Sequence, residues 1–134
     1  MNKNPLIMKN LLLLILLMPL LASLDNANLA NITKAISEGN ADALGQYFDQ
    51  TVEVAVLDKE DVYNKAQAVS IVRKFFAENK PTSFSQVHKG ASPNNDSQYC
   101  IGNLSAGGKT FRVYIYMKVS GGQYLIQELR FDKE

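Results

Sequence analysis

The stretch "KTFRVYIYMK", residues 109–118, decides the fold prediction because its apolar and polar side chains alternate without a break. A period of two is typical of a β-strand that has one face buried and one face toward solvent. The apolar set is Phe111, Val113, Ile115 and Met117, and the other set is Arg112, Tyr114, Tyr116 and Lys118. We expect the apolar set to pack against helices and the second set to face outward.

Three more segments of the C-terminal half have the composition of strands. They are "FSQVHKG" (84–90), "SQYCIGNL" (97–104) and "QYLIQELRF" (123–131). The pairs Gly107-Gly108 and Gly121-Gly122 predict tight hairpin turns, because glycine adopts positive φ at little cost. Four strands in a row, joined in this way, predict an antiparallel sheet.

The residues before this run predict two short helices, a hairpin and a third helix. The helical segments are "NLANITKAISEGN" (28–40), "ADALGQYF" (41–48) and "KAQAVSIVRKFFAEN" (65–79), and the hairpin is "TVEVAVL" (51–57) with a short return strand "VYN" (62–64). Asn64 and Gln67 resemble a capping box, and Pro81 ends the third helix. The fold class predicted is therefore α+β, a curved antiparallel sheet (a cone) with N-terminal helices packed on its concave face.

The first 24 residues have the features of a secretory signal. A basic head with Lys3 and Lys9 precedes the apolar run "LLLLILLMPLLAS" (11–23), which is short for a membrane span. We expect a signal peptide at residues 1–24 and one exported domain, periplasmic or secreted, at residues 25–134. The alternative is an uncleaved segment that anchors the chain in a membrane.

Composition argues against several classes of function. Removing Lys3 and Lys9 from the 14 basic residues leaves 12, against 13 acidic residues, so the domain has no basic footprint for nucleic acid. The single cysteine excludes an internal disulfide, and one cysteine with one histidine cannot form the usual zinc cage. We expect no metal and no cofactor, and we expect Cys100 to be a buried apolar residue.

The only histidine, His88, has three interpretations. Strand alternation places it on the same side as Phe84 and Gln86, toward the interior or the mouth of the cone. There it could hydrogen-bond to the backbone or to Tyr99, line a ligand pocket together with Tyr99 and Tyr47, or serve as a general base. A single histidine without a placed acid or nucleophile is a weak catalytic signal.

The chain resembles the nuclear transport factor 2-like superfamily, the cone fold shared with ketosteroid isomerase and scytalone dehydratase. Within it, the chain is similar to a bacterial secreted family of unknown function. The segments that carry this resemblance are "GNADALGQYFDQTVEV" (39–54), "VHKGAS" (87–92), "YCIGNL" (99–104), "FRVYIYMK" (111–118) and "IQELRF" (126–131). The resemblance implies the fold across most of the chain and says little about activity.

If the chain were an enzyme of this superfamily, the resemblance would imply a catalytic carboxylate, or a histidine–aspartate pair, that faces a dry pocket. No candidate here matches that pattern. Glu53 alternates with the strand valines and should face solvent, Asp49 should lie in a turn, and Glu128 should share a face with Tyr124, Ile126 and Arg130, where an ion pair explains it.

Three hypotheses for function stay open at this point. The first is an exported, non-enzymatic domain that binds a small apolar ligand or a peptide in the cone, or pairs as a homodimer through the outer sheet face at Arg112, Tyr114 and Tyr116. The second is an isomerase-like or dehydratase-like enzyme with a pocket near His88. The third is an interaction module of a larger envelope assembly that works through Tyr114 and Tyr116.

Overall fold

The computed structural model describes residues 24–134, so the predicted signal peptide lies outside the described residues except for its last position. The chain divides into two compact units, Met1–Ala30 and Asn31–Glu134. Helix α2 (Leu24–Glu38) begins in the first unit and ends in the second. No helix between residues 24 and 134 has the length and apolar content needed to cross a bilayer.

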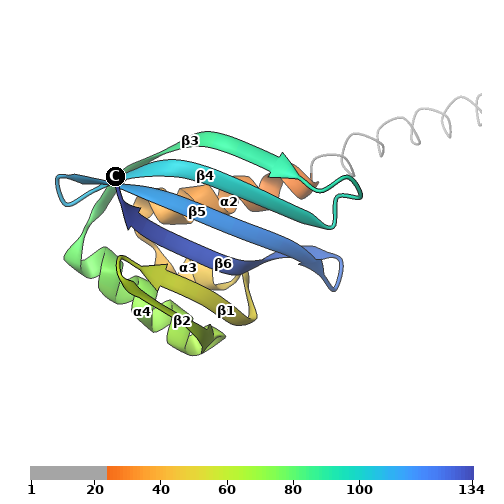
Figure 1. Ribbon diagram of the computed structural model, residues 1–134, viewed down its shortest axis with the longest axis horizontal. Coiled ribbons are helices and arrows are strands. Elements are labelled where there is room, and N and C mark those ends of the chain that lie inside the picture. The colour runs from red at the N-terminus through yellow and green to blue at the C-terminus, as the bar shows by residue number, and fades with distance from the viewer. Residues whose placement is uncertain (1–23) are drawn as a thin grey trace, which may run out of the picture. The chain divides into compact units, whose positions relative to one another are not determined.

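The second unit has the predicted order of a helical start, a hairpin, a helix and four strands (Figure 1). After α2 its elements are α3 (Ala41–Gly45), β1 (Phe48–Val56), β2 (Lys59–Asn64), α4 (Lys65–Glu78), β3 (Pro81–Ala91), β4 (Ser97–Ala106), β5 (Lys109–Ser120) and β6 (Gln123–Lys133). The α+β class with a curved sheet is confirmed.

The strands form one six-stranded, open sheet in the order β2-β1-β6-β5-β4-β3. Four of its five pairings are antiparallel, but β1 and β6 run parallel, so the prediction of a fully antiparallel sheet needs this correction. The alternating valines of β1 specify a buried face and are compatible with either strand direction. This pairing joins the β1–β2 hairpin to the C-terminal strands, and at its start the carbonyl of Tyr47 accepts a backbone hydrogen bond from Ile126 at 2.6 Å.

Local chemistry sets the helix starts and the hairpins. Asn40 caps α3, and Asn64 and Gln67 form the predicted capping box of α4. All four glycines of the two hairpins have positive φ, as expected of a turn that matches the twist of the sheet. Helix α3 is shorter than predicted because the chain enters β1 at Phe48, where pairing with β6 replaces the helical bonds.

The apolar set of β5 is fully buried, and its face is called the inner face below; the set with Tyr114 defines the outer face. The inner face packs against α4 through an aromatic cluster. The ring centroids of Phe75 and Phe131 are 4.5 Å apart, those of Phe75 and Phe111 are 5.1 Å apart, and those of Phe76 and Phe131 are 5.8 Å apart. These rings join α4 to β5 and β6 of the sheet.

Candidate functional site

The outer face gathers aromatic side chains on its central strands. Tyr99 of β4 pairs with Tyr116 of β5, and Ile101 pairs with Tyr114. The rings of Tyr99 and Tyr114 are stacked, with centroids 6.5 Å apart and an interplanar angle of 23°. Tyr99 is 38% exposed, and the other three side chains are half-buried. These four residues are called the aromatic patch.

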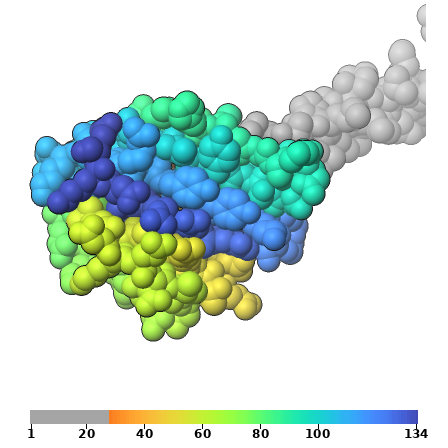
Figure 2. All heavy atoms as spheres, viewed as in Figure 1, coloured from red at the N-terminus to blue at the C-terminus, as the bar shows by residue number. Residues whose placement is uncertain are grey.

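A glycine on the neighbouring strand gives the patch room. Gly90 of β3 pairs with Tyr99, and a Cβ atom at Gly90 would lie 2.5 Å from the Cε1 atom of the Tyr99 ring. Any side chain at that position would therefore displace the ring. Figure 2 shows side chains of β4, β5 and β6 forming a continuous surface at the centre of this face.

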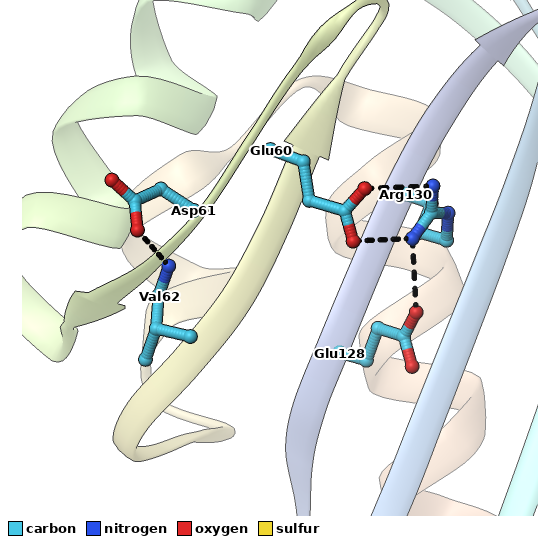
Figure 3. A network of polar contacts seen from close by, with 5 residues as sticks. All are labelled: Glu60, Asp61, Val62, Glu128 and Arg130. Carbon is cyan, nitrogen blue, oxygen red and sulfur yellow. Dashed lines mark hydrogen bonds and ion pairs between the residues drawn. The ribbon is translucent and has the colours of Figure 1, made fainter.

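An ionic network lies beside the patch (Figure 3). Arg130 of β6 donates from Nη1 and Nη2 to the two carboxylate oxygens of Glu60 on β2, at 2.9 and 3.3 Å. Its Nη1 atom also donates to Glu128 at 3.3 Å. Glu53 of β1 pairs with Glu128 in the sheet register and is the third carboxylate of the network, although Arg130 donates no hydrogen bond to it. This two-pronged geometry is the favourable one for an arginine–carboxylate pair.

The pKa values of this network follow from its geometry. The hydrogen bonds from Arg130 lower the pKa of Glu60. A hydrogen bond shared with Glu60, together with partial burial and the nearby charge of Glu128, raises the pKa of Glu53. Burial, followed by the charge of Glu128, raises the pKa of Tyr114, so the patch and the network interact electrostatically.

Positive charge lies on the same face at both ends of β5. Arg112 donates from Nε to the Oδ1 atom of Asn103 at 3.1 Å, and its Nη2 atom is 3.7 Å from Glu134. Lys118 is exposed near the other end of the strand. The outer face therefore combines an aromatic centre with side chains of both charges, and Arg112, Tyr114 and Tyr116 share it as predicted.

The predicted orientation of His88 is wrong. The strand pairing shifts between Gln86 and His88, where Val87 is an extra residue, so His88 pairs with Ile101 and lies on the outer face. A bulge of this kind inserts one residue and reverses the alternation after it. The His88 side chain is exposed and makes no hydrogen bond with another described residue, neither to Tyr99 nor to a backbone group.

The three residues predicted to share a pocket do not come together. His88 and Tyr99 lie on the outer face, whereas Tyr47 lies between α3 and β1, beside a shallow hollow of about 280 Å³ formed with the end of α2. Their roles in binding stay predictions. Cys100 is fully buried on the inner face, as expected, and burial raises the pKa of its thiol.

A second bulge corrects the prediction for Glu128. The pairing of β5 with β6 shifts at Gln127, so Tyr124 and Ile126 are buried while Glu128 and Arg130 lie on the outer face. Gln127 donates instead to Asp49 at 3.1 Å, and Asp49 lies in β1 rather than in a turn.

Sequence reasoning missed Glu60 as a partner of Arg130, because the predicted hairpin strands, 51–57 and 62–64, leave Glu60 in the turn between them. The actual turn is only Leu57 and Asp58, and β2 begins at Lys59. The alternation from Glu60 to Val62 was the available signal, and it is too short to distinguish a strand from a turn.

Comparison with known families identifies one family model that matches the chain. A family model described as "Domain of unknown function (DUF4783)" matches residues 29–132. No curated protein matches.

Solved structures agree with this assignment. A DUF4783 family protein from Bacteroides ovatus is 28% identical with a TM-score of 0.74, over 78% of this chain and 94% of that chain. The corresponding protein from Bacteroides uniformis is 28% identical with a TM-score of 0.75, over 78% and 95%. An NTF2-like protein of unknown function from Cytophaga hutchinsonii is 12% identical with a TM-score of 0.56, over 77% and 83%, and shows the fold alone. The chain belongs to the DUF4783 family and has the NTF2-like fold that the resemblance implied.

Proposed function

We propose that this domain is an exported, non-catalytic binding protein whose contact surface is the outer face of the sheet, and that its partner there is a second copy of the chain. The aromatic patch is the observation that carries the proposal. Tyrosine and arginine are enriched where proteins meet, because they combine apolar area with hydrogen-bonding groups. Here both lie on one open surface.

The charges around the patch also support pairing of two copies. Three carboxylates, Glu53, Glu60 and Glu128, lie on one side of the patch, and Arg112 and Lys118 lie on its central strand. In a two-fold pair the same patch faces itself, so a rotated copy can bring unlike charges together. A single-sign surface would instead repel its copy.

The inner face offers less support for binding inside the cone. The rings of Phe75, Phe76, Phe111 and Phe131 pack against one another between α4 and the sheet. The groups that an isomerase-like site would use, His88 and Glu53, lie on the outer face instead of in a dry pocket. We therefore favour binding at the surface over catalysis in the cone.

The test compares the protein with Tyr114→Glu in light scattering over a range of concentrations. We expect the wild type to reach the mass of two copies and Tyr114→Glu to stay at the mass of one, because removing a carboxylate from water at the centre of the contact opposes association. Val119→Glu is the matched control, since it adds the same charge to an exposed position near the end of β5, on the opposite side of the strand. A wild type that stays at the mass of one copy would refute the pairing.

Export is tested separately, by a fusion of residues 1–30 to a reporter enzyme that works only outside the cytoplasm. We expect reporter activity from the fusion and none from a version in which Leu13 and Leu16 are both replaced by Arg, because charge destroys the apolar run that a signal requires. If the unaltered fusion shows no reporter activity, the chain is not exported and that part of the proposal is wrong.

A further inference from the structure

A pocket of about 490 Å³ opens on the inner side of the β1–β2 hairpin, away from the outer face. Its floor is apolar and comes from the hairpin and from α4. The floor residues are Val54, Val56, Leu57, Ile71 and Phe75. Its volume lies within the range of sites that bind small molecules.

Each wall of this pocket carries one positive and one negative side chain. Asp58 and Lys59 lie at the hairpin turn, and Lys74 and Glu78 lie one helical turn apart on α4. None of the four makes an ion pair or a side-chain hydrogen bond with another described residue.

These unpaired acids are unusual in this protein. Between Glu38 and Glu134, every other acidic side chain takes part in an ion pair, a hydrogen bond or a charge interaction with a described residue, whereas Asp58 and Glu78 take part in none. The rim of the pocket therefore holds charges of both signs that are free to meet a ligand.

The turn that forms one wall is strained. Of its two residues, only Leu57 has positive φ, at 55°, and this first turn position normally requires glycine. A leucine there costs about 1–2 kcal/mol. A backbone hydrogen bond of 2.9 Å from Leu57 to the carbonyl of Phe131 holds the turn in place. Leu57 stays 38% exposed, so its side chain is accessible to a ligand in the pocket.

We propose that this pocket binds a small zwitterion with an apolar body, the chemistry of a free apolar amino acid or a short apolar peptide with free ends. The apolar body rests on Phe75, Ile71 and Leu57. The ligand carboxylate is received by Lys59 or Lys74, and the ligand ammonium by Asp58 or Glu78. The strain at Leu57 is retained because its side chain completes the apolar wall.

The experiment follows backbone amide signals by NMR while the dipeptide Leu-Phe is added. We expect saturable shifts at Val56, Lys59, Ile71 and Phe75, which line or flank the pocket. The same dipeptide with an acetylated amino end and an amidated carboxyl end should bind several-fold more weakly, because it has lost both charges. Gly-Gly should produce no saturable shift, because it has the charges without the apolar body.

The decisive variant is Leu57→Gly. It should bind Leu-Phe about five-fold more weakly, because part of the apolar contact is lost. Its melting temperature should equal or exceed that of the wild type, since glycine accepts positive φ. Leu57→Asn, which also tolerates this backbone conformation, should weaken binding in the same way.

Two controls separate this proposal from the pairing of copies. Tyr114→Glu changes the outer face only and should bind Leu-Phe with unchanged affinity, whereas Glu78→Gln should bind it about three-fold more weakly. Absence of saturable shifts at the pocket residues would overturn the proposal. Equal affinity for the free and capped dipeptides, or for Leu57→Gly and the wild type, would overturn it as well.

Discussion

The ionised carboxylate of Glu53 lowers the stability of the folded state. Its neighbours in the ionic network are the carboxylates of Glu60 and Glu128, while Arg130 donates its hydrogen bonds to those two and not to Glu53. The pKa of Glu53 is therefore raised from its ordinary value of 4.5. The folded state holds this proton more tightly than the unfolded chain, so stability falls as pH rises through the raised pKa.

Glu53→Gln should accordingly stabilise the protein at neutral pH. The gain should be on the order of 1–3 °C in melting temperature at pH 7, because solvent screening keeps such surface effects small. It should shrink toward pH 4, where Glu53 is already protonated. Calorimetry at the two pH values measures this difference. A gain that is larger at pH 4 than at pH 7 would contradict the assignment.

Residue positions within strands could be predicted from the sequence as far as the alternation continues. On β5 every side chain from Phe111 to Lys118 faces as predicted. The prediction fails for His88 and Glu128 because each follows a bulge, at Val87 and Gln127, and neither bulge has a glycine or proline to mark it. The turn at Leu57 has no sequence signal either, because leucine is atypical there.

At the scale of elements, α4 depends on its first turn. The backbone N–H of Gln67 donates to the Oδ1 atom of Asn64 at 2.8 Å, and the N–H of Asn64 donates to the Oε1 atom of Gln67 at 3.2 Å. These bonds give hydrogen-bond acceptors to backbone N–H groups that have no partner inside the helix at its start. Since α4 supplies Phe75 and Phe76 to the core, its start is coupled to the packing of the sheet.

Asn64→Ala should therefore lower the free energy of unfolding by about 0.5–2 kcal/mol. Asn64→Asp is the matched variant, because its carboxylate keeps the capping bond, and it should stay close to the wild type. Urea denaturation followed by circular dichroism measures both. If the alanine variant were as stable as the wild type, or the aspartate variant as unstable as the alanine variant, the capping box would not support α4.

Elements were predictable because caps, glycine pairs and hydrophobic periods are local signals. The Asn64 cap and the two glycine hairpins lie where the pattern predicted them. The parallel pairing of β1 with β6 was not predictable, because it joins strands about 70 residues apart and no turn between them fixes their direction.

At the scale of the whole second unit, one sheet separates two surfaces. The aromatic patch and its ionic network lie on the outer face, and the zwitterion pocket lies on the inner side of the β1–β2 hairpin. The two meet at the β1–β2 hairpin, where Glu53 and Glu60 belong to the network and Val54 and Lys59 line the pocket. A variant on the rim of either surface should therefore leave the other intact.

The central claim, that the outer face is where this protein meets its partner, is tested most directly by recording backbone amide spectra of the isotopically labelled protein in a dilution series. The account predicts concentration-dependent shifts at Tyr99, Ile101, Tyr114 and Tyr116, with Val54 and Phe75 unchanged. Spectra that do not change with concentration, or changes that cluster on α4 and spare β4 and β5, would contradict it.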